Sequence, residues 1–536
     1  MQVSAGMWGL LMLAGVLGTA LDTAPGAALR PAQPAMRQNG TAAPRSDQVK
    51  KPKQQPGTGD QGKTDPELQA MVDGAAAAPP EIGADILIRL AESRRVANRS
   101  MKVEFLSKAF ELAATAEQPV KRAAMSGGMG DVPTALLSRA YRLNMDKLSL
   151  QSRVVNDLLP LDALKARERF EEIQFPSLSP VGCEERLTYD VELFYETLGR
   201  VARRGFTTKD KLKGRQIALL TPFVGTLQSH AQAKPAAELL VSARLSASDL
   251  GQLANLFAGA LAQLRGDERS FAATAMGTGG DGITGSVANL VTTLGAKEIS
   301  SVALLRGLRQ YLVTNFGEVR CDSWRGDNDP LPDAVKYFNQ QFRRELQLAQ
   351  IAPITGDELR KARIIPRVPP AVYWQSPESK RLVTEMRRLR FGDGESRLTD
   401  PDKTTPAWSS QLTDFVTELE AWQPDNEPQA NVFHQKSILY AGLIDLMPAG
   451  PERSKVIESY VAFLEQNSAQ TPSRIEWLVH ADDLLSGKRA GDDREEVIQA
   501  FVNSGDPTLS LYGRVERWEQ RHPGTALEPG ATPPRR

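Results

Sequence analysis

Residues 411–422 read QLTDFVTELEAW, and the spacing of their apolar side chains decides the fold. Leu412, Phe415 and Leu419 recur at intervals of three and four residues, which places them on one face of an α-helix. Similar stripes run through most of the chain after residue 81, and no long stretch alternates apolar and β-branched with polar residues as a strand does. The sequence therefore predicts an all-α protein.

The helical segments come in pairs separated by short breaks. In the C-terminal part, Pro451 stands at a first-turn position, where its missing N–H costs nothing, and Gly487 can end a later helix. This arrangement predicts stacked helical hairpins, an α-solenoid-like array with irregular repeats. The unit size is that of tetratricopeptide-like repeats, but no strict period of about 34 residues holds, so no family is assigned.

An apolar segment near the N-terminus predicts export. Residues 7–17, MWGLLMLAGVL, precede the small residues Gly18-Thr19-Ala20. The apolar run is shorter than the ~20 residues that span a bilayer, which favours a cleavable signal peptide over residues 1–20. The preceding residues contain no Lys or Arg, so an uncleaved anchor stays open as the alternative. We expect a periplasmic or secreted protein, with no membrane span unless this segment is retained.

Composition then divides the rest of the chain. Residues 21–80 are rich in Pro, Ala, Gln and Gly, and no aromatic residue occurs between Trp8 and Phe105, so we expect a disordered linker. The other predicted parts are N-terminal helical hairpins (81–175), a middle helical domain (176–390), a linker loop (391–408), a C-terminal helical domain (409–522) and a disordered tail (523–536).

The charge balance and the two cysteines limit the function classes. The chain has 65 basic and 65 acidic residues, and zero net charge argues against a nucleic-acid partner. Cys183 and Cys321 are the only cysteines, and two cysteines in an exported protein predict one disulfide. Two buried free thiols are the alternative.

No cofactor or metal site is predicted. The glycine-rich segment 277–285, GTGGDGITG, lacks the Lys that a phosphate-binding loop needs, so an interhelix loop is expected. The acidic segment 327–329 lacks the Gly and Glu positions of a calcium loop. The four histidines do not have zinc-ligand spacing. His480 stands beside Asp482 and Asp483, which favours charge pairing on the surface.

No catalytic residue is assigned either. A Ser–His–Asp arrangement is open, because its members are distant in sequence, but no nucleophile-elbow motif supports one. Tyr373 and Trp374 stand in a predicted interhelix segment and are the candidate partner-contact residues, with packing between domains as the alternative.

These features favour an exported helical scaffold, or a module that binds an unknown peptide or protein partner. An all-α cell-envelope hydrolase, with a cleft between the middle and C-terminal regions, is the first alternative. A purely structural envelope component is the second. The absence of catalytic motifs favours a protein that is not an enzyme and leaves catalysis open.

Overall fold

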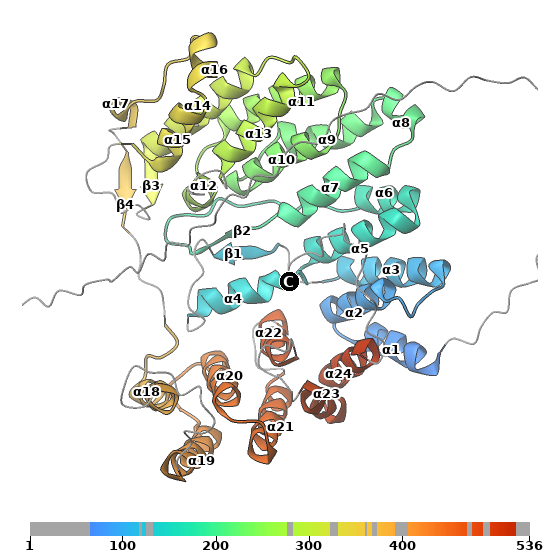
Figure 1. Cartoon of the computed structure of the whole chain (residues 1–536), viewed down its shortest axis with the longest axis vertical. Coiled ribbons are helices and arrows are strands. Elements are labelled where there is room, and N and C mark those ends of the chain that lie inside the picture. The colour runs from blue at the N-terminus through green and yellow to red at the C-terminus, as the bar shows by residue number, and fades with distance from the viewer. Residues whose placement is uncertain are drawn as a thin grey trace, which may run out of the picture. The chain divides into compact units, whose positions relative to one another are not determined.

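The chain is all-α, with many helices packed against one another, as the computed structural model shows (Figure 1). The structure describes residues 65–116, 120–124, 132–275, 282–321, 331–359, 362–366, 372–391, 406–468, 474–485 and 494–520. The predicted signal peptide, nearly all of the linker loop 391–408 and the predicted tail 523–536 lie outside these residues. Among the described helices, none is both long and apolar enough to cross a membrane.

The helices up to the middle of the chain follow each other closely. They are α1 (Pro66–Ala77), α2 (Pro80–Glu92), α3 (Arg99–Ala114), α4 (Pro133–Arg142), α5 (Lys147–Leu161), α6 (Ala163–Glu171), α7 (Glu192–Arg204), α8 (Thr208–Leu212), α9 (Arg215–Gly225), the 3₁₀-helix η1 (His230–Gln232), α10 (Ala233–Ser242), α11 (Ala247–Gln263) and α12 (Glu268–Ala275).

The remaining helices include the C-terminal hairpins. They are α13 (Ile283–Gly295), α14 (Val302–Glu318), α15 (Asp333–Gln341), α16 (Arg343–Leu348), α17 (Gly356–Leu359), α18 (Pro377–Phe391), α19 (Pro406–Ala421), α20 (Gln429–Leu446), α21 (Pro451–Gln466), α22 (Arg474–Leu485), α23 (Arg494–Asn503) and α24 (Pro507–Gln520). Pro451 opens α21, as its position in the sequence predicts.

Successive helices stack on their neighbours. Helix α2 packs on α3, α3 on α5, and α5 on α7. Further along the chain, α7 packs on α10, and α11 packs on α14. In the C-terminal part, α20 packs on α21, and α23 on both α21 and α24. This is the pattern of stacked hairpins that the helical periodicity predicts, and it joins most buried apolar side chains of the described residues into one core.

The C-terminal helices also return to the N-terminal ones. Helix α24 contacts α1 and α2, and α22 contacts α4. Figure 1 shows α24, in red, beside α1, in blue. The described residues therefore form one compact unit, in which helices far apart in sequence share a core.

Helix α1 lies within the range predicted to be a disordered linker. Its residues Leu68, Met71, Val72 and Ala75 are buried and lie at helical spacing on one face. Because this short stripe contains no aromatic residue, it does not stand out in the sequence. Helix α1 is buried by contacts with α2 and α24, and no local sequence pattern predicts those contacts. The prediction for residues 66–77 was therefore wrong, and residues 21–64 lie outside the described part of the chain.

Four three-residue strands interrupt the described helices. Strand β1 (Arg122–Ala124) pairs antiparallel with β2 (Leu187–Tyr189), and β3 (Val319–Cys321) pairs parallel with β4 (Arg363–Ile365). Such short pairs carry no alternating pattern long enough to detect in sequence. They join segments that lie far apart in the chain without changing the helical class.

A disulfide links Cys183 to Cys321, with Cα atoms 5.1 Å apart. Cys183 lies in the loop before β2, and Cys321 ends β3. Both are buried, in a small cluster with Ala272. The predicted bridge is confirmed, and free thiols are excluded at these two positions. In the chain-entropy model, closing a loop of 138 residues raises the free energy of unfolding by about 4–5 kcal/mol.

Substitution of two glycines in helices tests how closely α11 and α14 pack. A Cβ on Gly307 of α14 would lie 2.4 Å from the main-chain oxygen of Ala258 in α11, whereas a Cβ on Gly259 would meet nothing within 4 Å. We expect Gly307→Ala to lower the free energy of unfolding by about 1–3 kcal/mol, because the helices must separate. Gly259→Ala should raise it by about 0.5–1 kcal/mol, because alanine is the better helix former.

Urea denaturation of the full chain measures both changes. If Gly307→Ala is stabilising, as Gly259→Ala should be, α11 and α14 do not approach as closely as described.

Candidate functional site

A buried carboxylate holds the loop that carries Cys183. Asp267 is 2% exposed and has a left-handed backbone, with φ 53°. Its carboxylate accepts hydrogen bonds from the main-chain N–H of Val181, at 2.8 Å, and from the hydroxyl of Ser229. The guanidinium of Arg269 donates to the main-chain oxygen of Cys183. These contacts fix the disulfide-bearing loop against α12 and η1.

The same place brings a serine, a histidine and an aspartate together, but not as a catalytic triad. Ser229 donates directly to Asp267, and no hydrogen bond joins it to the ring of His230. The ring nitrogens of His230 lie 2.9 Å from the hydroxyl of Tyr311 and 2.6 Å from the main-chain oxygen of Gly266. Ser229 and His230 are fully buried. A nucleophile needs a base beside it and access to substrate, so this cluster is structural.

Burial determines the charge state of His230. Removal from water lowers the pKa of its imidazole to about 4, and the hydrogen bond to Gly266 opposes this only in part. The ring is therefore neutral at pH 7. Because a main-chain oxygen can only accept, Nε2 carries the proton, and Nδ1 accepts from Tyr311.

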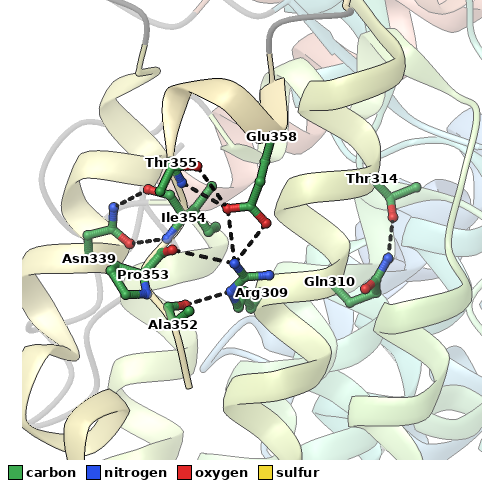
Figure 2. A network of polar contacts seen from close by, with 9 residues as sticks. All are labelled: Arg309, Gln310, Thr314, Asn339, Ala352, Pro353, Ile354, Thr355 and Glu358. Atoms are coloured by element: carbon green, nitrogen blue, oxygen red, sulfur yellow. Dashed lines mark hydrogen bonds and ion pairs between the residues drawn. The ribbon is translucent and has the colours of Figure 1, made fainter. Parts of the chain in front are cut away.

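A second polar network fastens the loop between α16 and α17 (Figure 2). The guanidinium of Arg309 donates to both carboxylate oxygens of Glu358, at 2.8 and 3.0 Å, and to the main-chain oxygen of Ala352. Asn339 exchanges two hydrogen bonds with the main chain of Ile354. Figure 2 shows these groups directed toward one another, which indicates a structural clamp.

The electrostatics of the clamp agree with that role. Partial burial of Glu358 opposes ionisation, but the N–H of Thr355 and the guanidinium of Arg309 outweigh it and hold the pKa of the carboxyl below its usual value. A carboxylate that is charged and fully engaged is not available as a general acid or base.

Tyr373 and Trp374, the predicted partner-contact residues, are buried. They are 3% and 7% exposed. The main-chain oxygen of Tyr373 accepts a hydrogen bond from Gln435 at 2.6 Å, and its ring centroid lies 5.6 Å from that of His434. Burial raises the pKa of the Tyr373 hydroxyl. Both side chains pack within the described residues, and their contact with a partner stays a prediction.

Two buried histidines, His434 and His480, contact each other, and the ring of His434 also lies next to Tyr373. The Nδ1 atom of His434 lies 3.0 Å from Nε2 of His480, and Glu476 lies 3.4 Å from the other ring nitrogen of His434. Both histidines are 3% exposed, so the surface position predicted for His480 is wrong. Asp483, three residues after His480 on α22, forms its ion pair with Arg139 of α4. Within the described residues, no three His, Cys, Asp or Glu side chains could hold a metal ion.

A pocket of about 670 Å³ lies where the end of α19 and the following segment meet α20 and α21. We call it the α20–α21 pocket. Its lining residues are Glu420, Trp422, Gln423, Pro424, Asp425, Gln429, Val432, Phe433, Lys436, Tyr440, Ser459, Ala462, Phe463, Gln466 and Asn467.

The lining of the α20–α21 pocket combines aromatic rings with polar side chains. Phe433 stacks on Phe463 with ring centroids 5.6 Å apart, and Tyr440 lies at the same distance from Phe463. Burial raises the pKa of Tyr440 to about 12, so its hydroxyl stays protonated. The polar groups of the lining are carboxamides, the carboxylates of Glu420 and Asp425, a serine hydroxyl and one ammonium group. The accessible surface of the pocket is mainly polar, with a smaller aromatic part.

Sequence reasoning missed this pocket. Phe433, Tyr440 and Phe463 stand at apolar positions of helical stripes, and such aromatic residues are usually core. The one local signal is Lys436, a charged residue between Phe433 and Tyr440 on a face of α20 that is otherwise buried.

Comparison of the chain with protein-family models, with curated proteins and with solved structures finds no match. The fold class by itself does not determine an activity. The function is therefore argued from the chemistry of the α20–α21 pocket.

The neutral state of His230 predicts a pH dependence of stability. The unfolded chain binds a proton at this ring near pH 6.5, but the folded chain does so only near pH 4. As the pH falls from 6.5 to 4, protons bind preferentially to the unfolded state, so the free energy of unfolding decreases. The slope that this residue contributes approaches about 1.4 kcal/mol per pH unit.

Urea denaturation between pH 7 and 4 measures that slope for the wild type and for His230→Asn. The variant should be less stable at pH 7 and should lose this component of the pH dependence. Identical slopes in the two proteins would show that His230 is not held neutral by burial.

Proposed function

We propose that this protein is an exported helical binding module, and that it binds a peptide segment in the α20–α21 pocket. The single observation that carries the proposal is the composition of the pocket lining, in which aromatic walls stand beside carboxamide side chains. The pocket volume is within the range of about 300–1,000 Å³ that is usual for ligand sites.

Peptide chemistry fits this lining. Each peptide unit carries one N–H donor and one C=O acceptor. The carboxamides of Gln423, Gln429 and Gln466 each offer an oxygen that can accept from the N–H and an NH₂ group that can donate to the C=O. The partly exposed ring of Phe463, which stacks on the buried Phe433, offers an apolar surface for a ligand side chain. A ligand with alternating polar and apolar groups satisfies both parts of the lining, whereas a purely apolar ligand leaves the carboxamides unpaired.

Export is supported by the disulfide between Cys183 and Cys321, because such bonds form and persist in oxidising compartments. The apolar segment 7–17 is the second support, from sequence alone. A module of this kind needs no catalytic group, and the geometry around Ser229 and His230 provides none.

A filling substitution tests the proposal. Ala462 is exposed and lines the pocket, so Ala462→Phe places a ring in the cavity without replacing a core residue. Ala114 is an exposed alanine on α3, outside the lining, and Ala114→Phe is the matched control. A random hexapeptide pool, half with free and half with amidated C-termini, is equilibrated with each full-length protein, and retained peptides are counted by mass spectrometry.

We expect the wild type and Ala114→Phe to retain the same subset of peptides, and Ala462→Phe to retain roughly tenfold less of it, a loss of about 1.4 kcal/mol in binding. Circular dichroism verifies that both variants are folded. Absence of any retained subset with the wild type, or undiminished retention by Ala462→Phe, would contradict the proposal.

A further inference from the structure

In the α20–α21 pocket the positively charged side chain is buried, whereas the negatively charged side chains are exposed. Lys436 of α20 is 6% exposed, although it carries an ammonium group. The two acidic side chains of the lining, Glu420 and Asp425, are exposed. The inner part of the pocket is therefore cationic, and its solvated rim is acidic.

The ammonium group of Lys436 is incompletely paired. It can donate three hydrogen bonds, and within the described residues it donates one, to the main-chain oxygen of Glu420 at 3.2 Å. It lies 5.7 Å from the ring centroid of Phe463. No carboxylate oxygen of the described residues forms an ion pair with it. Loss of hydration lowers the pKa of Lys436, and the field of the nearby Glu420 carboxylate offsets this only in part.

A buried ammonium without a carboxylate partner costs free energy unless an anion compensates it. The contact with Phe463 recovers only part of that cost. A ligand carboxylate reaching Lys436 would supply charge-assisted hydrogen bonds to the unused donors. The acidic rim disfavours an extended anion such as a polyphosphate, so the anionic group of the ligand is small and lies at its end.

We propose that the α20–α21 pocket binds the carboxyl-terminal end of a peptide, with the terminal carboxylate on Nζ of Lys436 and an apolar last side chain against the partly exposed ring of Phe463. The preceding peptide units lie along the carboxamides near the rim. This assignment rests on the proposed function and specifies its ligand.

Three peptide pools separate the sources of a carboxylate. The first contains random acetylated hexapeptides with free C-termini, and the second contains the same sequences amidated. The third is amidated and carries one fixed internal Glu. N-Acetylphenylalanine, added separately, presents a terminal carboxylate without further peptide units. Retention by the full-length protein is measured by equilibrium dialysis with mass spectrometry.

We expect the free-acid pool to be enriched in apolar last residues and to bind about 10- to 100-fold more tightly than either amidated pool, as expected for a hydrogen-bonded charge pair. N-Acetylphenylalanine should compete weakly. Lys436→Met preserves the stem of the side chain and should abolish the preference for free acids. Lys455→Met, which removes an exposed lysine of α21 outside the lining, should leave it unchanged.

The outcomes distinguish this inference from the proposed function. Equal retention of free acids and amides by the wild type overturns the terminal carboxylate and leaves the pocket as a peptide site. Stronger retention of the internal-Glu pool overturns the terminal position. No retention from any pool overturns both. Lys436→Met is expected to fold, because removal of a buried charge relieves a desolvation cost, and thermal unfolding verifies this.

Discussion

The guanidinium of Arg89 is the group through which the two ends of the helical array are joined. It lies on α2 and is 6% exposed, and it donates to Glu516 of α24 at 2.6 Å and to Glu519 at 2.7 Å. Arg494 of α23 reaches the other oxygen of Glu516 at 3.1 Å. Desolvation of these charges is expensive, and the cost is offset only while every partner is in place. The network therefore specifies one way in which α24 can sit on α2.

Several further contacts depend on that position. Tyr512 of α24 donates to Asp85, which also pairs with Arg153 of α5 at 2.8 Å. The apolar side of α1 is covered by α2 and α24, and α22 packs on α4. The C-terminal hairpins that form the α20–α21 pocket are thus held on the N-terminal helices by polar contacts as well as by the shared core.

The sequence predicts what depends on local pattern and misses what depends on long-range packing. The stripe of Leu412, Phe415 and Leu419 identifies a helix because three apolar residues spread over two turns suffice to define the face. The pairing of Cys183 with Cys321 could be predicted because they are the only two cysteines and the apolar N-terminal segment predicts export. Burial of α1 requires α24 at the other end of the chain, the contact of His434 with His480 joins α20 to α22, and the pocket around Lys436 is lined by three different segments, so no single stretch contains the signal.

The most direct measurement is the coupling free energy between Arg89 and Glu516, obtained from urea denaturation of Arg89→Met, Glu516→Leu and the double variant. If the two side chains form the buried pair described, each single change lowers the free energy of unfolding by about 1.5–3 kcal/mol, because it removes a charge-assisted hydrogen bond, while Arg89 keeps Glu519 and Glu516 keeps Arg494. The double variant should then be more stable than the sum of the single changes implies, by about 1–3 kcal/mol. Additivity within about 0.5 kcal/mol would contradict the joining of α2 to α24 through this pair.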